Sequence, residues 1–343
     1  MQISRYGRWA TTILLLAFLA DSVTAQCVHI ERRRSGDYPS ARVYDDFEIS
    51  KSDRYCLTEN ITVGRKFVIS EGGEKSNNAP IGYINASDVE INLQGNSLVA
   101  NAVGTWVLDA GNYKRRGEVS VAHLIVRNGI LRSRTVSGLR ATHLLGPYFG
   151  SVISDFTLVF SDPQAVLQDD IIEPLSKIRN NFPVTGHRLL NLTIDVGAWG
   201  IHPKRRIWQS GVAIQGAGNE IRDSTITTSD AHAGIYLFGP KQIIENNTII
   251  FKGSPSAPSG APIKLHAADN SIIRNNTIVV EGWVGKPDAA ISLIDSRNVV
   301  IENNRIIGVK QLYKVWDDRS DQRSSVIERG NKFPTLWEQI LRR

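Results

Sequence analysis

The chain has little cysteine, little leucine and, after its first 25 residues, no long hydrophobic run. With only 2 Cys and no C-x-x-C spacing, nothing supports a metal or redox role for the thiols. No later stretch approaches the roughly 18 apolar residues of a membrane-spanning helix, so we expect no membrane span. The 25 Leu stand against 37 Ile and 27 Val, a balance that favours strands and disfavours an all-helical protein.

Residues 1–25 have the pattern of a secretory signal peptide. Arg5 and Arg8 precede an apolar run of 11 residues that ends at Ala20, and the small residues of Val23-Thr24-Ala25 suit cleavage by a signal peptidase. We therefore expect a mature chain that begins at Gln26 and is soluble, either periplasmic or secreted.

The mature chain keeps both cysteines, Cys27 and Cys56. In an oxidising compartment they can close a loop of about 30 residues, which stabilises a fold by roughly 3 kcal/mol. We interpret them as a disulfide that holds an N-terminal cap, residues 26–60. Two free thiols are the alternative.

The chain carries a net charge of +6 at pH 7. Loss of the signal peptide removes two Arg and one Asp, so the mature charge is +5. This balance suits an anionic partner, and export disfavours nucleic acid as that partner.

An internal repeat is the most informative feature of the sequence. Four copies have the form Ile-x-Asn-x-x-Ile or Ile-x-Asp-x-x-Ile, and they begin 23, 29 and 28 residues apart. They are Ile221-Arg-Asp-Ser-Thr-Ile226, Ile244-Glu-Asn-Asn-Thr-Ile249, Ile273-Arg-Asn-Asn-Thr-Ile278 and Ile301-Glu-Asn-Asn-Arg-Ile306. Weaker copies begin at Leu93, Val126, Ile153, Leu189 and Ile327, which gives nine units over residues 85–333. A period of this length indicates a solenoid, propeller or array.

A second element, with apolar residues at alternate positions, precedes each strong copy. The four examples are Gly211–Ile214, Gly234–Leu237, Pro262–Leu265 and Ala290–Leu293. Alternation with period two is typical of strands, so each coil is expected to hold at least two short strands joined by Asn- or Gly-rich turns. The leucine-rich repeat frame is absent, and a propeller blade needs about 40 residues.

This pattern resembles the right-handed parallel β-helix of the pectate-lyase-like superfamily. Its Ile-x-Asn-Asn-x-Ile coils are similar to those of periplasmic polysaccharide-active and NosD-like members. The resemblance implies an all-β, single-stranded right-handed parallel β-helix of about nine or more coils over residues 61–333. Residues 26–60 would cap one end and a short helix in residues 334–343 the other. Equivalent asparagines, about 4.8 Å apart in stacked coils, are predicted to form hydrogen-bonded ladders.

Extra residues fall after the Asn-Asn-x-Ile strand of successive coils, as in Phe251 to Ala261 and Gly282 to Asp288. Insertions at equivalent corners build one wall of a groove, and the neighbouring strand forms its floor. The outward positions of that floor strand carry candidate functional side chains. These are Tyr236, Phe238, Lys264 and His266, with Arg140 upstream in the same column and His232 within reach.

These residue types suit a uronic-acid polymer. Lyases and C5-epimerases of such polymers remove the proton at C5, and a cation beside the carboxylate stabilises the charge that develops. Lys264 can neutralise the carboxylate, while His266, His232 or Tyr236 moves the proton. Asp230-Ala-His232 also resembles the Asp-Pro-His motif of mannuronan C5-epimerases, which makes Asp230 a further candidate, although Ala231 replaces the proline.

A second candidate is a basic segment between two tryptophans. Aromatic faces with adjacent cations suit sugar rings that carry carboxylates or sulfates. The alternative is a basic loop that its tryptophans anchor to the coil. The segment comprises Trp199, His202, Lys204, Arg205, Arg206 and Trp208.

The sequence leaves two functions open. One is an exported β-helix that acts on an acidic polysaccharide, as a lyase or C5-epimerase. The other is a non-catalytic periplasmic factor for polysaccharide binding, assembly or maturation, as the NosD resemblance implies. Hydrolysis is disfavoured because the outward floor positions lack the required carboxylate pair. We expect a monomer without a cofactor or metal site, with loop-bound calcium left open.

Overall fold

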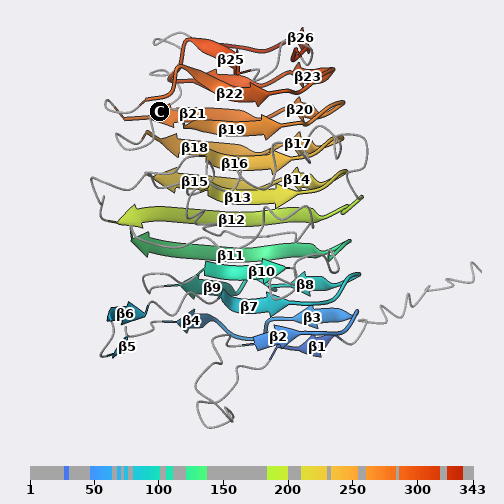
Figure 1. Cartoon of the computed structure of the whole chain (residues 1–343), viewed down its shortest axis with the longest axis vertical. Helices are drawn as coiled ribbons and strands as arrows, with labels where there is room; N and C mark the ends of the chain where they lie inside the picture. The colour runs from blue at the N-terminus through green and yellow to red at the C-terminus, as the bar shows by residue number, and fades with distance from the viewer. Residues whose placement is uncertain are drawn as a thin grey trace, which may run out of the picture.

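The computed structural model describes the parts of the chain that form the strands and their tight turns. These are residues 27–30, 47–63, 68–70, 73–75, 80–100, 106–110, 121–136, 184–199, 210–229, 233–253, 260–282, 286–316 and 323–334. All elements assigned in these ranges are β-strands. They stack along the long axis of the molecule in chain order (Figure 1).

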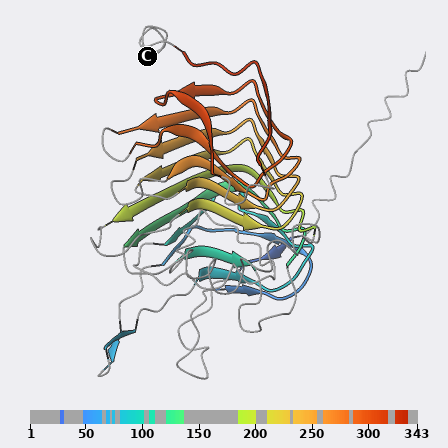
Figure 2. The same cartoon turned by 45° about the horizontal axis from the view of Figure 1, so that its top comes forward.

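Four successive coils of the C-terminal half each contain three short strands. In one coil these are β16 (Ala233–Phe238), β17 (Ile243–Glu245) and β18 (Thr248–Lys252). Each pairs in parallel with its counterpart one coil later, which is β19 (Ala261–His266), β20 (Ile272–Arg274) or β21 (Thr277–Glu281). The tilted view shows the successive turns lying over one another (Figure 2).

The strands form two main parallel sheets. The five-stranded sheet contains β13 (Ser210–Gln215), β16, β19, β22 (Ala289–Ile294) and β25 (Gln311–Val315). The first ladder of the 16-stranded sheet contains β1 (Val28–His29), β3 (Arg54–Cys56), β8 (Glu90–Asn92), β11 (Ile125–Val136), β12 (Arg188–Trp199), β14 (Glu220–Arg222), β17, β20, β23 (Val299–Glu302) and β26 (Val326–Arg329). Its second ladder contains β4 (Ile61–Val63), β9 (Ser97–Ala100), β15 (Thr225–Ser229), β18, β21 and β24 (Arg305–Ile307).

Two smaller sheets lie toward the N-terminus. One contains β2 (Phe47–Ile49), β7 (Pro80–Ile84) and β10 (Trp106–Ala110). The other is an antiparallel pair, β5 (Val68–Ser70) and β6 (Gly73–Lys75).

The expected number of coils is confirmed, but two of the units differ from those that the sequence indicates. Ten strands form the first ladder of the large sheet. Strands β11 and β12 are direct hydrogen-bonded neighbours, so the repeat copy that begins at Ile153 adds no coil between them. That copy lies outside the described residues. Conversely, β3 lies within residues 26–60 and pairs with β8, so the parallel ladder already begins before residue 61.

The repeated isoleucines form the core of the coils. The first isoleucine of each strong copy is fully buried, and the second is at most 1% exposed. They stack in register through the parallel pairs, so each coil places the same apolar side chain over the last one. The predicted period of the sequence is therefore the period of the core.

The predicted asparagine ladder is confirmed, and the two asparagines of each pair have different roles. The second one is buried: Asn276 donates to Asn304 Oδ1 at 3.0 Å and to the Ile244 carbonyl at 2.9 Å. Its own Oδ1 accepts from the backbone N–H of Asn247 at 2.9 Å. The first one, such as Asn275 with φ of 57°, takes the left-handed backbone conformation of the turn.

Replacing a ladder asparagine will therefore cost far more stability than replacing its neighbour. Asn276→Ala leaves buried backbone groups without partners, and we expect the free energy of unfolding to fall by about 3 kcal/mol. Asn275→Gly is the matched control, because glycine accepts the left-handed conformation and Asn275 is exposed. Denaturant unfolding of both variants measures the difference. Equal losses would contradict the division of roles.

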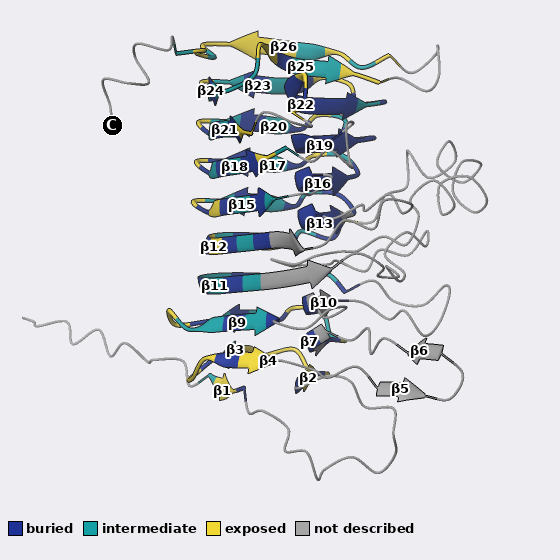
Figure 3. Cartoon of the chain, turned by 90° about the vertical axis from the view of Figure 1, so that its left-hand side faces the viewer, coloured by how far each residue is buried: buried dark blue, intermediate teal, exposed yellow. Residues whose placement is uncertain are grey.

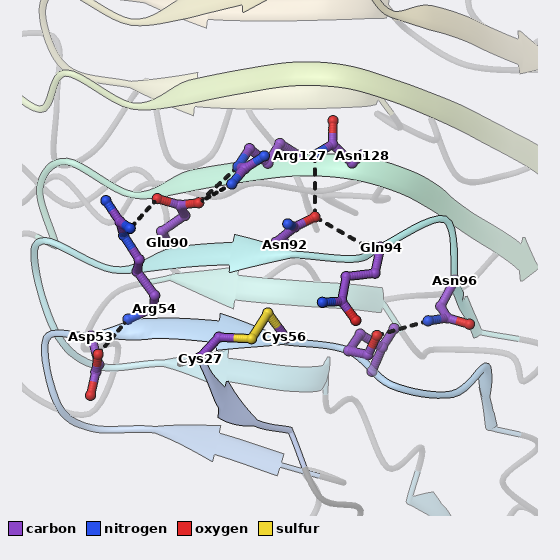
Figure 4. Close-up of a disulfide and its surroundings, with 11 residues drawn as sticks. Cys27, Asp53, Arg54, Cys56, Glu90, Asn92, Gln94, Asn96, Arg127 and Asn128 are labelled. Atoms are coloured by element: carbon purple, nitrogen blue, oxygen red, sulfur yellow. Dashed lines mark hydrogen bonds and ion pairs between the residues drawn. A yellow bond between two sulfur atoms is a disulfide. The ribbon is translucent and has the colours of Figure 1, made fainter. Parts of the chain in front are cut away.

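The predicted disulfide is also confirmed. Cys27 and Cys56 are bonded, with their Cα atoms 5.6 Å apart, and so tie β1 to β3. Figure 4 shows the bond beside the ion pairs that Glu90 makes with Arg54 and Arg127. The disulfide thus fastens the first short strand of the stack to the next coil.

His187, immediately before β12, is a fully buried histidine of the core. Its Nδ1 accepts a hydrogen bond from the backbone N–H of Leu124 at 3.0 Å, so the ring is neutral there. Burial and, second, the charge of His123 lower the pKa of His187 to about 3.

This histidine makes the fold sensitive to acid. At a pH between the folded pKa of His187 and its unfolded value of about 6.5, the unfolded chain binds one more proton than the folded chain. The contribution of His187 to the free energy of unfolding is therefore fully present above about pH 6.5 and is lost as the pH falls below it. We expect His187 to contribute a loss of about 1.4 kcal/mol per pH unit between about pH 6.5 and 5. Unfolding curves of His187→Asn should lack this slope, whereas the exposed-site control His29→Asn should keep it. An unchanged slope in His187→Asn would refute the assignment.

Candidate functional site

The outward residues of the five-stranded sheet form columns that run across the coils. Register places Tyr236 beside Lys264, Lys264 beside Ser292, and Ser292 beside Lys314. In the next column Phe238 lies beside His266. The residues that alternate with them along β16, such as Ile235 and Leu237, are fully buried in the core.

The four candidate side chains of β16 and β19 are buried, whereas the sequence indicated an exposed face. Tyr236 and Lys264 are each 8% exposed, His266 5% and Phe238 3%. Figure 3 shows β13, β16, β19 and β22 as a dark blue stack. A parallel sheet is commonly buried on both faces, and alternation shows only which side a residue faces, not whether that side is open to water.

These four side chains contact one another as one cluster, which we call the tyrosine–histidine cluster. Tyr236 Oη lies 3.5 Å from His266 Nδ1, a long contact for a hydrogen bond. Lys264 Nζ lies 5.9 Å from the centroid of the Tyr236 ring. The rings of Phe238 and His266 meet edge to face, with centroids 4.7 Å apart. A phenol, an imidazole and an ammonium are thus brought together in a buried cluster.

The remaining predicted site residues fall where the structure describes no side chain. Trp199 is described only in its backbone, as the last residue of β12. Outside the described residues lie Arg140, His202, Lys204, Arg205, Arg206, Trp208, Asp230 and His232. Their roles therefore stay predictions, although Asp230 and His232 directly precede β16 in the chain.

Many arginines of the large sheet are paired with carboxylates, so they add no net positive charge for a ligand. Glu245, on β17, bonds to Arg222 on one side and to Arg274 on the other, the latter at 2.6 Å. The hydrogen bond from Arg274, together with the charges of both arginines, holds the pKa of Glu245 below its usual range despite its burial. Register continues this alternation through Glu302 and Arg329, 3.8 Å apart. We call these five residues the ion ladder.

No three His, Cys, Asp or Glu side chains gather in a way that could hold a metal ion within the described ranges. In the same part of the chain there is no helix with the length and apolar character needed to cross a bilayer.

Comparison with known families agrees with this architecture. Residues 205–333 match the family model of the right handed beta helix region. The chain folds as a right-handed parallel β-helix. The matched part of the β-helix runs from before β13 to beyond β26, and it contains both the tyrosine–histidine cluster and the ion ladder. Neither a curated protein nor a solved structure matches the chain significantly.

Proposed function

We propose that this β-helix is an exported protein that acts on a uronic-acid-containing polysaccharide by acid–base chemistry at C5. The observation that carries the proposal is the 3.5 Å contact between Tyr236 Oη and His266 Nδ1, with Lys264 on the neighbouring strand. Two groups that can exchange a proton thus lie beside a cation, which is the combination that C5 chemistry needs.

The roles follow from the charge that the reaction generates. Removal of the C5 proton places negative charge on the adjacent carboxylate, and Lys264 is the described side chain of the cluster that can stabilise it. Tyr236 and His266 serve as the base and the acid. In a lyase the C4–O bond then breaks, the leaving oxygen takes a proton, and a C4–C5 double bond remains. In a C5-epimerase the proton returns to the opposite face of the ring. Both outcomes share the first step.

Burial of the cluster supports strong electrostatic action at this place. An ammonium beside a carboxylate is worth several times more in a site of low polarity than in water. The same burial also favours the second candidate, a binding or assembly factor without turnover. A side chain that is at most 8% exposed offers a polymer little surface, so in that case the cluster has no catalytic role. Export agrees with the confirmed disulfide, since disulfides persist in oxidising compartments.

An activity assay separates the two candidates. The mature protein would be incubated with polygalacturonate, polymannuronate, polyguluronate and hyaluronan, following ultraviolet absorbance for unsaturated ends and NMR for inversion at C5. We expect turnover of at least one polymer. His266→Gln and Lys264→Met should each lower it by at least about 100-fold, because general acid–base and charge-stabilising groups contribute that much.

The control is Tyr313→Phe, because this tyrosine of β25 packs against the hydrophobic core and lies outside the tyrosine–histidine cluster. It should keep full activity, and thermal unfolding of each variant would show that the fold survives. Binding of a polymer without any turnover would replace the enzyme by the binding factor. Turnover that persists in both cluster variants would move the site elsewhere.

A further inference from the structure

A surface pocket of about 230 Å³ lies beside the last two strands of the five-stranded sheet. Its walls come from the start of β19 with the residue before it, from β22 with the residue before it, and from the end of β25 with the residue after it. They include Gly260, Asp288, Ser292, Lys314 and Trp316. Asp288 ends the second predicted insertion, so the pocket lies at the corner where the coil lengths vary.

Ser292 gives the first sign that the pocket holds a ligand. This residue is 4% exposed, and its Oγ has no hydrogen-bond partner among the residues that the structure describes. A buried hydroxyl without a partner costs about 1–3 kcal/mol. Such a cost at a residue that lines a pocket is offset when a ligand hydroxyl supplies the missing hydrogen bond.

Trp316 gives the second sign. Its side chain is 45% exposed although it is among the largest apolar groups of the chain. Lys314 Nζ lies 4.2 Å from the centroid of the indole, a cation–π contact that fixes the ring against the pocket wall. An indole held in this way presents a flat apolar surface to a ligand ring.

The charges of the pocket balance one another. Lys314 Nζ bonds to Asp288 Oδ2 at 2.8 Å, so the two charged side chains among the described lining residues are paired with each other. The exposed carboxylate of Asp288 still has acceptor positions for hydroxyl groups. The volume is below the range of about 300–1,000 Å³ that drug-sized ligands occupy, and it suits one small ring.

We infer that this pocket binds a single neutral pyranose ring. The sugar's C–H face packs on the indole of Trp316, while its hydroxyls bond to Ser292 Oγ and to Asp288. Ser292 lies beside Lys264 in the register of the sheet, so one polymer can place a uronate at the tyrosine–histidine cluster and a neutral sugar here. The inference does not depend on the proposed C5 chemistry, because the pocket and the cluster are built from different side chains.

Binding of neutral methyl glycosides tests the inference directly. The mature protein would be titrated with methyl β-D-glucopyranoside, methyl β-D-galactopyranoside and methyl α-D-mannopyranoside, following saturation-transfer NMR. We expect at least one to bind with a dissociation constant of about 1–10 mM. Trp316→Ala should weaken this binding by about tenfold, and Ser292→Ala by a similar factor without lowering the melting temperature.

Two variants serve as matched controls. Phe333→Ala removes another aromatic side chain of similar exposure, and Asp195→Asn changes another exposed ion pair, the one with Arg132. Both should bind the glycoside as the unmodified protein does. The inference is overturned if none of the three glycosides binds, if Trp316→Ala binds unchanged, or if methyl β-D-glucuronide binds more tightly than the neutral sugars. Each of these results leaves the lyase and epimerase assay unaffected, so the two proposals fail separately.

Discussion

Parallel, in-register stacking of coils is the constraint on which the rest of the structure depends. In the two main sheets the strands of one coil hydrogen-bond in parallel to those of the next, so outward and inward positions repeat about every 4.8 Å. A residue type that cannot tolerate a copy of itself as a neighbour is excluded from a repeated position. Isoleucine and asparagine satisfy this condition, one by apolar packing and the other because its amide both donates and accepts. The Asn247–Asn276–Asn304 ladder is therefore a consequence of the stacking and not a binding feature.

Charged residues meet the same constraint by alternation. Arginine above arginine would repel, so the ion ladder alternates Arg222, Glu245, Arg274 and Glu302 on successive coils. The outward column of the five-stranded sheet neither repeats one residue type nor alternates opposite charges. Its successive residues are Tyr236, Lys264, Ser292 and Lys314. Stacking alone does not require this variety. A column that departs from the repeat is where selection for a ligand can act, which is why both proposals concern this sheet.

The sequence determines the fold class because the core repeats, and it fails where the repeat is imitated or hidden. The copy at Ile153 has the right spacing of apolar residues, yet the direct pairing of β11 with β12 leaves no room for its coil between them. Strand β3 lies in residues 26–60, which contain no Asn-Asn pair that would indicate a coil. The cluster residues were found by alternation, but alternation carries no information about burial. The sequence does not indicate Ser292 and Trp316 as binding residues. Whether a hydroxyl has a hydrogen-bond partner, and whether an indole lies at a pocket, depends on the three-dimensional structure.

The repeated polar contacts that stabilise the stack lie in the large sheet. The large sheet carries the asparagine ladder, the ion ladder and the disulfide. These contacts stabilise the stack, so the five-stranded sheet can keep a buried hydroxyl at Ser292 that has no hydrogen-bond partner among the described residues and that costs stability. Strain that persists where the rest of a fold over-determines it is characteristic of functional sites. The same parallel stacking therefore produces repeated polar ladders in the large sheet and a column of unlike side chains in the five-stranded sheet.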